Sequence, residues 1–152
     1  MDTPPARPPA FARARSLARL ALLTLASSSC GYFAGGEWSD DPANWERAFR
    51  TPQPAGADVL HSYYTRSGHW SYEFEGYFAL APNDALCERI IADNALERLA
   101  DEPAEWYGRP AWFRPKPAAA YEAWGPRAET LSQLRLLVDR DSGRLFLYDA
   151  AF

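Results

Sequence analysis

The chain has 152 residues, of which 47% are apolar and 24% are charged, an ordinary globular composition that argues against intrinsic disorder. Residues 30–152 are enough for one domain and too few for two ordinary ones. They carry 12 basic and 19 acidic residues, a net charge of −7. This negative charge argues against binding to nucleic acid or to anionic membrane surfaces, because both attract basic patches.

The first 29 residues have the pattern of a secretory signal peptide. Four arginines precede a short apolar run from Leu20 to Ala26, and three small residues, Ser27–Ser29, follow it. This order of basic, apolar and small residues is typical of exported proteins. The run is too short and too rich in small polar residues to cross a membrane, which takes about 20 mostly apolar residues.

Cys30 stands at the expected cleavage site. Small residues before a cysteine resemble the signal of bacterial lipoproteins, in which that cysteine is lipidated, for example with palmitate, and becomes the new N-terminus. Ser28 and Ser29 suit the two positions before the cysteine, whereas Ser27 stands where the pattern prefers Leu. The resemblance covers residues 1–30 and implies a lipid anchor at Cys30. Gly31, in place of a retention-type Asp, points to the outer membrane, facing the periplasm.

These features divide the chain into a signal peptide (1–29), a lipidated cysteine with its tether (30–36) and a single domain (37–152). Two alternatives stay open, an ordinary secretory peptide cut nearby and an uncleaved or cytoplasmic product. Cys87 is the second of the two cysteines. It could form a disulfide with Cys30 outside the cytoplasm, but beside a lipidated Cys30 we expect a buried, inert thiol.

The domain begins with a predicted helix and a predicted hairpin. The helix covers 42–50, with Asp41 as its cap. Alternating apolar residues predict strands over 59–65 and 70–80, joined by a turn at 66–69 that contains Gly68. A two-residue loop sets His61 opposite Phe74, which places His61 on the apolar, core-facing side. Tyr64 and Tyr77 then fall on the other side, toward water or a partner.

Three further segments follow in chain order. An apolar stripe predicts a helix over 84–100, with Asn83 as its cap. Residues 101–129 contain five prolines and six aromatic residues, which excludes regular sheet, and a short helix is predicted from Ala118 to Trp124. A second hairpin is predicted over 134–139 and 144–149. The expected fold class is therefore α+β, an antiparallel sheet of two hairpins with a helix packed on one face and a long Pro- and aromatic-rich segment.

Candidate catalytic and metal-binding groups are few. The two histidines, His61 and His69, point to opposite faces in the predicted hairpin and cannot share a metal. Glu73 and Glu75 share a strand face, with carboxyl groups roughly 6–7 Å apart, near the separation of an inverting glycosidase. Alternating glutamates are also usual on a half-exposed strand. The sequence contains no known catalytic motif, so an enzyme is the less favoured class, and no metal or cofactor is expected.

Aromatic residues make up about one in six of residues 30–152. On a Pro-rich segment they can grip a protein partner or stack on sugar rings; alternatively Trp106, Trp112, Phe113 and Trp124 seal the segment onto the sheet. The candidate binding surface consists of Trp106, Arg109, Trp112, Phe113, Arg114 and Trp124.

Three functions follow from these observations. The favoured one is a non-catalytic, membrane-anchored lipoprotein that binds a protein partner in the cell envelope. The second is an envelope glycan-binding module that uses the aromatic Pro-rich segment. The third is a glycan hydrolase that uses Glu73 and Glu75.

Overall fold

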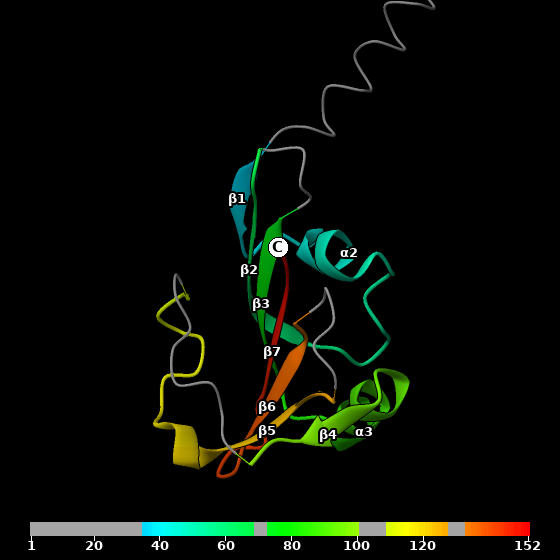
Figure 1. Ribbon diagram of the computed structural model, residues 1–152, viewed down its shortest axis with the longest axis vertical. Helices are drawn as coiled ribbons and strands as arrows, with labels where there is room; N and C mark the ends of the chain where they lie inside the picture. The colour runs from blue at the N-terminus through cyan, green and yellow to red at the C-terminus, as the bar shows by residue number, and fades with distance from the viewer. Residues whose placement is uncertain (1–34, 69–72, 101–108, 128–132) are drawn as a thin grey trace, which may run out of the picture. The chain divides into compact units, whose positions relative to one another are not determined.

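The computed structural model describes residues 35–68, 73–100, 109–127 and 133–152; the expected signal peptide and Cys30 lie outside these ranges. Its main element is a seven-stranded antiparallel sheet with the strand order β1-β2-β3-β7-β6-β5-β4 (Figure 1). The strands are β1 (Gly36–Ser39), β2 (Val59–Arg66), β3 (Phe74–Leu80), β4 (Leu96–Arg98), β5 (Tyr121–Pro126), β6 (Arg135–Asp139) and β7 (Leu145–Ala151).

The expected fold class is wrong, because the sheet dominates the fold and the two predicted hairpins supply only four of its strands. Two meanders, β1–β3 and β4–β7, join where β3 pairs with β7. β1, β4 and β5 were not predicted from the sequence. These strands are three to six residues long, and in so short a run the alternation of apolar and polar residues carries little signal.

Two short helices, α2 (Asn44–Phe49) and α3 (Asp84–Asp93), cover one face of the sheet (Figure 1). The predicted cap of α3 is confirmed, since the Asn83 side chain accepts a hydrogen bond from the Leu86 amide at 3.0 Å. The predicted end at residue 100 is wrong. Asn94 donates to the Ile90 carbonyl at 2.9 Å, and Ala95 takes a positive φ of 47°, which ends the helix. The next residue, Leu96, begins β4 and still packs into the core.

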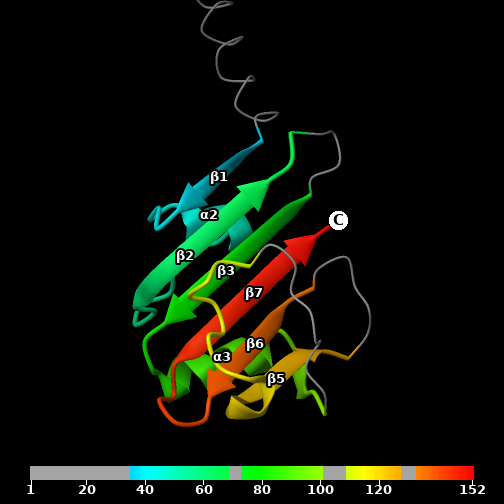
Figure 2. The ribbon, with the colours of Figure 1, turned by 90° about the vertical axis from the view of Figure 1, so that its left-hand side faces the viewer.

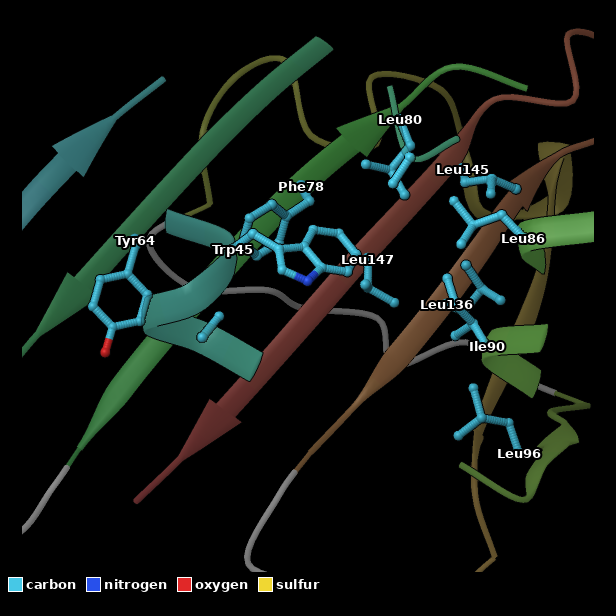
Figure 3. Packing of buried hydrophobic residues seen from close by; sticks show 12 residues of the cluster. Trp45, Tyr64, Phe78, Leu80, Leu86, Ile90, Leu96, Leu136, Leu145 and Leu147 are labelled. Carbon is cyan, nitrogen blue, oxygen red and sulfur yellow. The ribbon is translucent and has the colours of Figure 1, made fainter. Parts of the chain in front are cut away.

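The helix-covered face holds the larger part of the core (Figure 3). Trp45 of α2 packs edge-on against Phe78 of β3, with ring centroids 5.5 Å apart. Leu86 and Ile90 of α3 reach the same cluster from the other helix, near Leu136 of β6. Both helices are therefore held by apolar contact with one side of the sheet.

The first predicted hairpin exists, but its register differs from the prediction. His61 pairs with Ala79, and Phe74 pairs with Arg66, because the connection is longer than a tight turn. Its base is closed by a hydrogen bond from the Ser67 amide to the Glu73 carbonyl at 3.0 Å. The register shift is an odd number of residues, so it exchanges the two faces of one strand relative to the other.

The second predicted hairpin is confirmed by the pairing of β6 with β7. The Asp139 side chain accepts hydrogen bonds from the amides of Asp141 and Ser142, at 2.9 and 3.2 Å. Gly143 takes a positive φ of 68°, a conformation that favours glycine. Lys116, the single lysine of the chain, donates to Asp139 at 2.9 Å and so ties the preceding segment to this turn.

The face of the sheet opposite the helices is covered by residues 109–120, which we call the cover segment (Figure 2). It ends in a short 3-10 helix, η2 (Ala118–Ala120), that leads directly into β5. The predicted helix from Ala118 to Trp124 is therefore wrong. Tyr121 and Ala123 are buried while Glu122 and Trp124 are half-buried, the alternation of a strand.

Candidate functional site

The structure brings four of the six predicted surface residues together in the cover segment. Arg109 donates from Nη1 to the carbonyls of Phe113 and Arg114, at 3.1 and 2.9 Å, and the Phe113 amide donates to the Pro110 carbonyl at 3.0 Å. These bonds fold the segment into a tight turn that carries Trp112. Arg109 therefore positions the turn.

Phe113 is fully buried, with 0% of its surface exposed. Its ring meets Tyr77 and Phe146 of the sheet edge-on, at centroid distances of 5.0 and 5.7 Å. Trp124 packs with the core on the helix-covered face, across the sheet from Phe113, and Trp106 lies outside the described residues. The six predicted residues thus do not form one patch, because Phe113 anchors the cover segment and Trp124 belongs to the other side of the sheet.

His61 and Trp112 stack at the margin of the cover segment, with ring centroids 5.4 Å apart and planes 26° apart. The His61 side chain is half exposed, and its Nδ1 lies 3.5 Å from Oδ1 of Asp40. The prediction that His61 is buried on the core face is wrong, and the cause is the register of the first hairpin. His69 lies outside the described residues.

Two neighbouring rows of side chains cross the covered face beside this stack. The first row places Tyr63, Tyr77 and Tyr148 opposite one another on β2, β3 and β7. The second row places Glu37, Thr65 and Glu75 opposite one another on β1, β2 and β3. Neighbouring strands lie about 4.8 Å apart, so the two glutamates stand roughly 10 Å apart along the row. We call Glu37, Tyr63, Glu75, Tyr77 and Tyr148 the glutamate–tyrosine cluster.

The rows are joined by hydrogen bonds from phenols to carboxylates. Tyr148 donates to Oε1 of Glu75 at 3.4 Å, a long bond that leaves the carboxylate with acceptor capacity. Tyr63 hydrogen-bonds the Glu37 side chain. Solvent exposure falls across the cluster. Glu37 is exposed, Glu75 is half-buried, and Tyr77 and Tyr148 are buried.

Burial governs how these groups ionise. Burial raises the pKa of Glu75 above its ordinary value, and the hydrogen bond from Tyr148 opposes that shift. Burial also raises the pKa values of Tyr63, Tyr77 and Tyr148, and nearby Glu75 adds to each shift. The three phenols therefore stay protonated at neutral pH and act as hydrogen-bond donors. Within the described part of the chain, Glu75 forms no ion pair with an arginine or lysine.

The structure does not place Glu73 and Glu75 together on strand β3. Glu73 comes just before β3, which begins at Phe74. The strand geometry that would hold its carboxyl group about 6–7 Å from that of Glu75 therefore does not extend to Glu73. Cys87 is half-buried on α3. Burial raises the pKa of its thiol, which makes it a poor nucleophile at neutral pH.

A pocket of about 370 Å³ lies beside the exposed side of His61, with Asp40 and Asp41 in its wall. These two carboxylates already serve the fold. Asp40 accepts from the Ser62 amide at 2.9 Å, and Asp41 pairs with Arg47 at 2.9 Å. No group of three or more His, Cys, Asp or Glu side chains in the described ranges could hold a metal ion.

The glutamate–tyrosine cluster was not predicted from the sequence, although Glu75 was singled out. A correct register was needed to see that Glu75 shares a face with Tyr63 and Tyr148.

None of the helices that the structure describes has the length and apolar character to cross a membrane. The chain matches no protein family, no curated protein sequence and no solved structure.

Proposed function

We propose that the chain is an exported lipoprotein, anchored at Cys30 and facing the periplasm, whose sheet domain binds a protein partner without catalysis. The lipoprotein-like signal over residues 1–30 supports the anchor. β1 begins at Gly36, six residues after Cys30. Because an extended chain spans at most about 3.6 Å per residue, this tether would keep the domain within roughly 20 Å of the membrane surface. The partner would then be met at that surface.

The half-buried carboxylate of Glu75 carries the binding proposal. A carboxylate partly removed from water is unfavourable unless it is paired, and this one has a long hydrogen bond to Tyr148 and no cation from the described part of its own chain. Glu37 adds a second carboxylate in the same row. An arginine or lysine of a partner would pair with these groups, and the stacked rings of His61 and Trp112, beyond the tyrosine row, would offer a further aromatic contact. The proposed partner is therefore a protein with a basic surface.

Site-specific crosslinking from Thr65 tests this proposal, because Thr65 lies between Glu37 and Glu75 in the row. A photoreactive residue at this position in the full-length, membrane-anchored protein should give a discrete adduct with one envelope protein. The adduct should fall several-fold in the variant Glu37→Gln/Glu75→Gln and should weaken as salt is raised, since the pairing is electrostatic.

Glu97→Gln is the matched control. Glu97 is an exposed strand glutamate that pairs with Arg127 at 3.0 Å, at the other edge of the sheet. This variant should crosslink as strongly as the unmodified protein. Adduct yields that are equal in the cluster variant and in the control would refute the role of the two carboxylates.

The anchor is tested separately by Cys30→Ser. The unmodified protein should carry acyl chains at Cys30, seen as a mass increase of the processed N-terminal peptide, and should fractionate with membranes. The serine variant should lack the mass increase and appear in the soluble periplasmic fraction. A native product that begins with Met1 and carries no lipid would contradict export and anchoring together.

A further inference from the structure

A second pocket, of about 670 Å³, opens at the sheet edge formed by β4 and β5. Among the described residues, β4 pairs with Trp124–Pro126, and one further bond, from the Leu99 amide to the Ala123 carbonyl at 2.8 Å, extends this contact. The first residues of β5 therefore lie beyond the end of β4, and Tyr121, Glu122 and Ala123 of this part of β5 line the pocket. β1 forms the opposite edge of the sheet, so the pocket is separate from the glutamate–tyrosine cluster.

Two arginines in the pocket wall converge on one carboxylate oxygen. Arg98 of β4 donates to Oε1 of Glu122 at 3.0 Å, and Arg140 donates to the same oxygen at 3.2 Å. The backbone amide of Arg140 donates to the Ala120 carbonyl at 3.0 Å, which holds this arginine at the pocket. Glu122 thus orients two guanidinium groups that come from different elements.

The three side chains leave one positive charge and many donors for a ligand. A guanidinium group carries five N–H donors, and each of these two groups uses one of them on Glu122. Both arginine side chains are about half exposed, so their other N–H groups can reach a molecule in the pocket. Among the described residues of the wall, the others are Tyr121 and apolar side chains that include Leu99, Ala119 and Ala123.

We propose that this pocket binds a small organic monocarboxylate, with its carboxylate on Arg98 and Arg140 and its apolar body against the alanine and leucine wall. Arginine forks match the planar geometry of a carboxylate. The single net positive charge and the neighbouring Glu122 carboxylate favour a monoanion over a doubly charged phosphate ester. The volume lies within the range of small-molecule sites, about 300–1,000 Å³.

Ligand-observed fluorine NMR with the full-length protein tests the proposal, using 4-fluorobenzoate as the probe and neutral 4-fluorobenzamide as its control. The carboxylate should show saturable binding and the amide should not. The variant Arg98→Gln/Arg140→Gln should weaken binding at least tenfold, since both charge-assisted contacts are removed. Arg144→Gln, at an exposed arginine in the nearby turn, should bind as the unmodified chain does.

Glu122→Gln is the most informative variant, because it should bind 4-fluorobenzoate more tightly than the unmodified protein does. Without the competing carboxylate the two arginines carry two net positive charges, so 4-fluorobenzoate should bind several-fold more tightly. Glutamine keeps a side-chain oxygen that can accept from both arginines, so their orientation is retained while the competing charge is removed. No saturable binding, equal binding of the amide, insensitivity to the arginine variant, or weaker binding in Glu122→Gln would each overturn the proposal.

Discussion

Phe113 is the residue whose replacement best tests how the cover segment is held. Its ring is the fully buried side chain of that segment and fills the space over β3 and β7. Removing a buried phenylalanine ring costs about 3–5 kcal/mol, from lost apolar burial and from the cavity left behind. We therefore expect Phe113→Ala to lower the free energy of unfolding by about 3–5 kcal/mol, a large share of the roughly 5–15 kcal/mol typical of a domain.

Phe113→Leu separates the aromatic contacts from apolar burial. Leucine keeps much of the apolar volume but loses the edge-on contacts with Tyr77 and Phe146, whose ring planes lie at 78° and 85° to that of Phe113. Such aromatic pairs contribute about 0.5–1.5 kcal/mol each beyond burial. The leucine variant should therefore lose about 1–3 kcal/mol, clearly less than the alanine variant.

Urea unfolding followed by tryptophan fluorescence gives these free energies by linear extrapolation. Phe152→Ala is the control, because Phe152 is 66% exposed and its replacement should stay within about 0.5 kcal/mol of the unmodified protein. A loss below about 1 kcal/mol for Phe113→Ala would mean that Phe113 does not hold the cover segment. A leucine variant as stable as the unmodified protein would show that the aromatic geometry contributes nothing.

Four further predictions use the same unfolding measurement. Asn44→Ala should cost about 1–3 kcal/mol, because the buried amide donates to the Trp38 carbonyl at 3.0 Å; a loss within error would contradict this. Gly143→Ala should cost about 1–2 kcal/mol, since its φ of 68° crowds a Cβ atom; an unchanged urea midpoint would refute the strain. Hydrogen bonds from Lys116 lower the pKa of Asp139 from 3.8 to about 2. The stability that ionised Asp139 contributes to the fold is therefore complete above pH 3.8 and is lost as the pH falls toward 2. Asp139→Asn should therefore flatten the stability profile between these values, and an unchanged slope would contradict the pairing. Burial raises the pKa of Glu75 above 4.5. The contribution of this shift to the stability of the folded domain is therefore present below pH 4.5 and is lost as the pH rises through the raised pKa. Glu75→Gln should then be the more stable protein at pH 7, with no such gain below pH 4.5; a less stable variant at pH 7 would mean that the carboxylate has a compensating partner.

The hairpins show which parts of the fold the sequence could predict. The β6–β7 turn was predicted because its determinants are local, an aspartate that accepts turn amides and a glycine at positive φ. The β2–β3 hairpin was predicted to exist but not to pair correctly. Gly68 suggested a tight turn, whereas the hydrogen bond that closes the ladder joins Ser67 and Glu73.

The candidate site could not be predicted because it depends on that register. An odd shift in register moved His61 out of the core and brought Tyr77 into it.

The end of α3 was difficult to predict for a different reason. Leu96 continues the helical spacing of apolar residues while it packs from a strand, so periodicity alone cannot separate a longer helix from a helix followed by a strand.

Stability alone does not account for Glu75. Its side chain lies half-buried beside aromatic side chains, and the described part of the chain supplies a long hydrogen bond from Tyr148 and no ion pair with an arginine or lysine. An apolar residue at this position would extend the aromatic contacts that Phe113 makes with the adjoining row. Residues that oppose folding in this way concentrate where a surface binds something else. The charge of Glu75 would be neutralised by a partner, and β1, which follows the proposed tether, sets the row of Glu37 and Glu75 at the edge of the sheet nearest to that anchor in sequence. Under the proposed function, these carboxylates would meet a basic protein at the membrane surface.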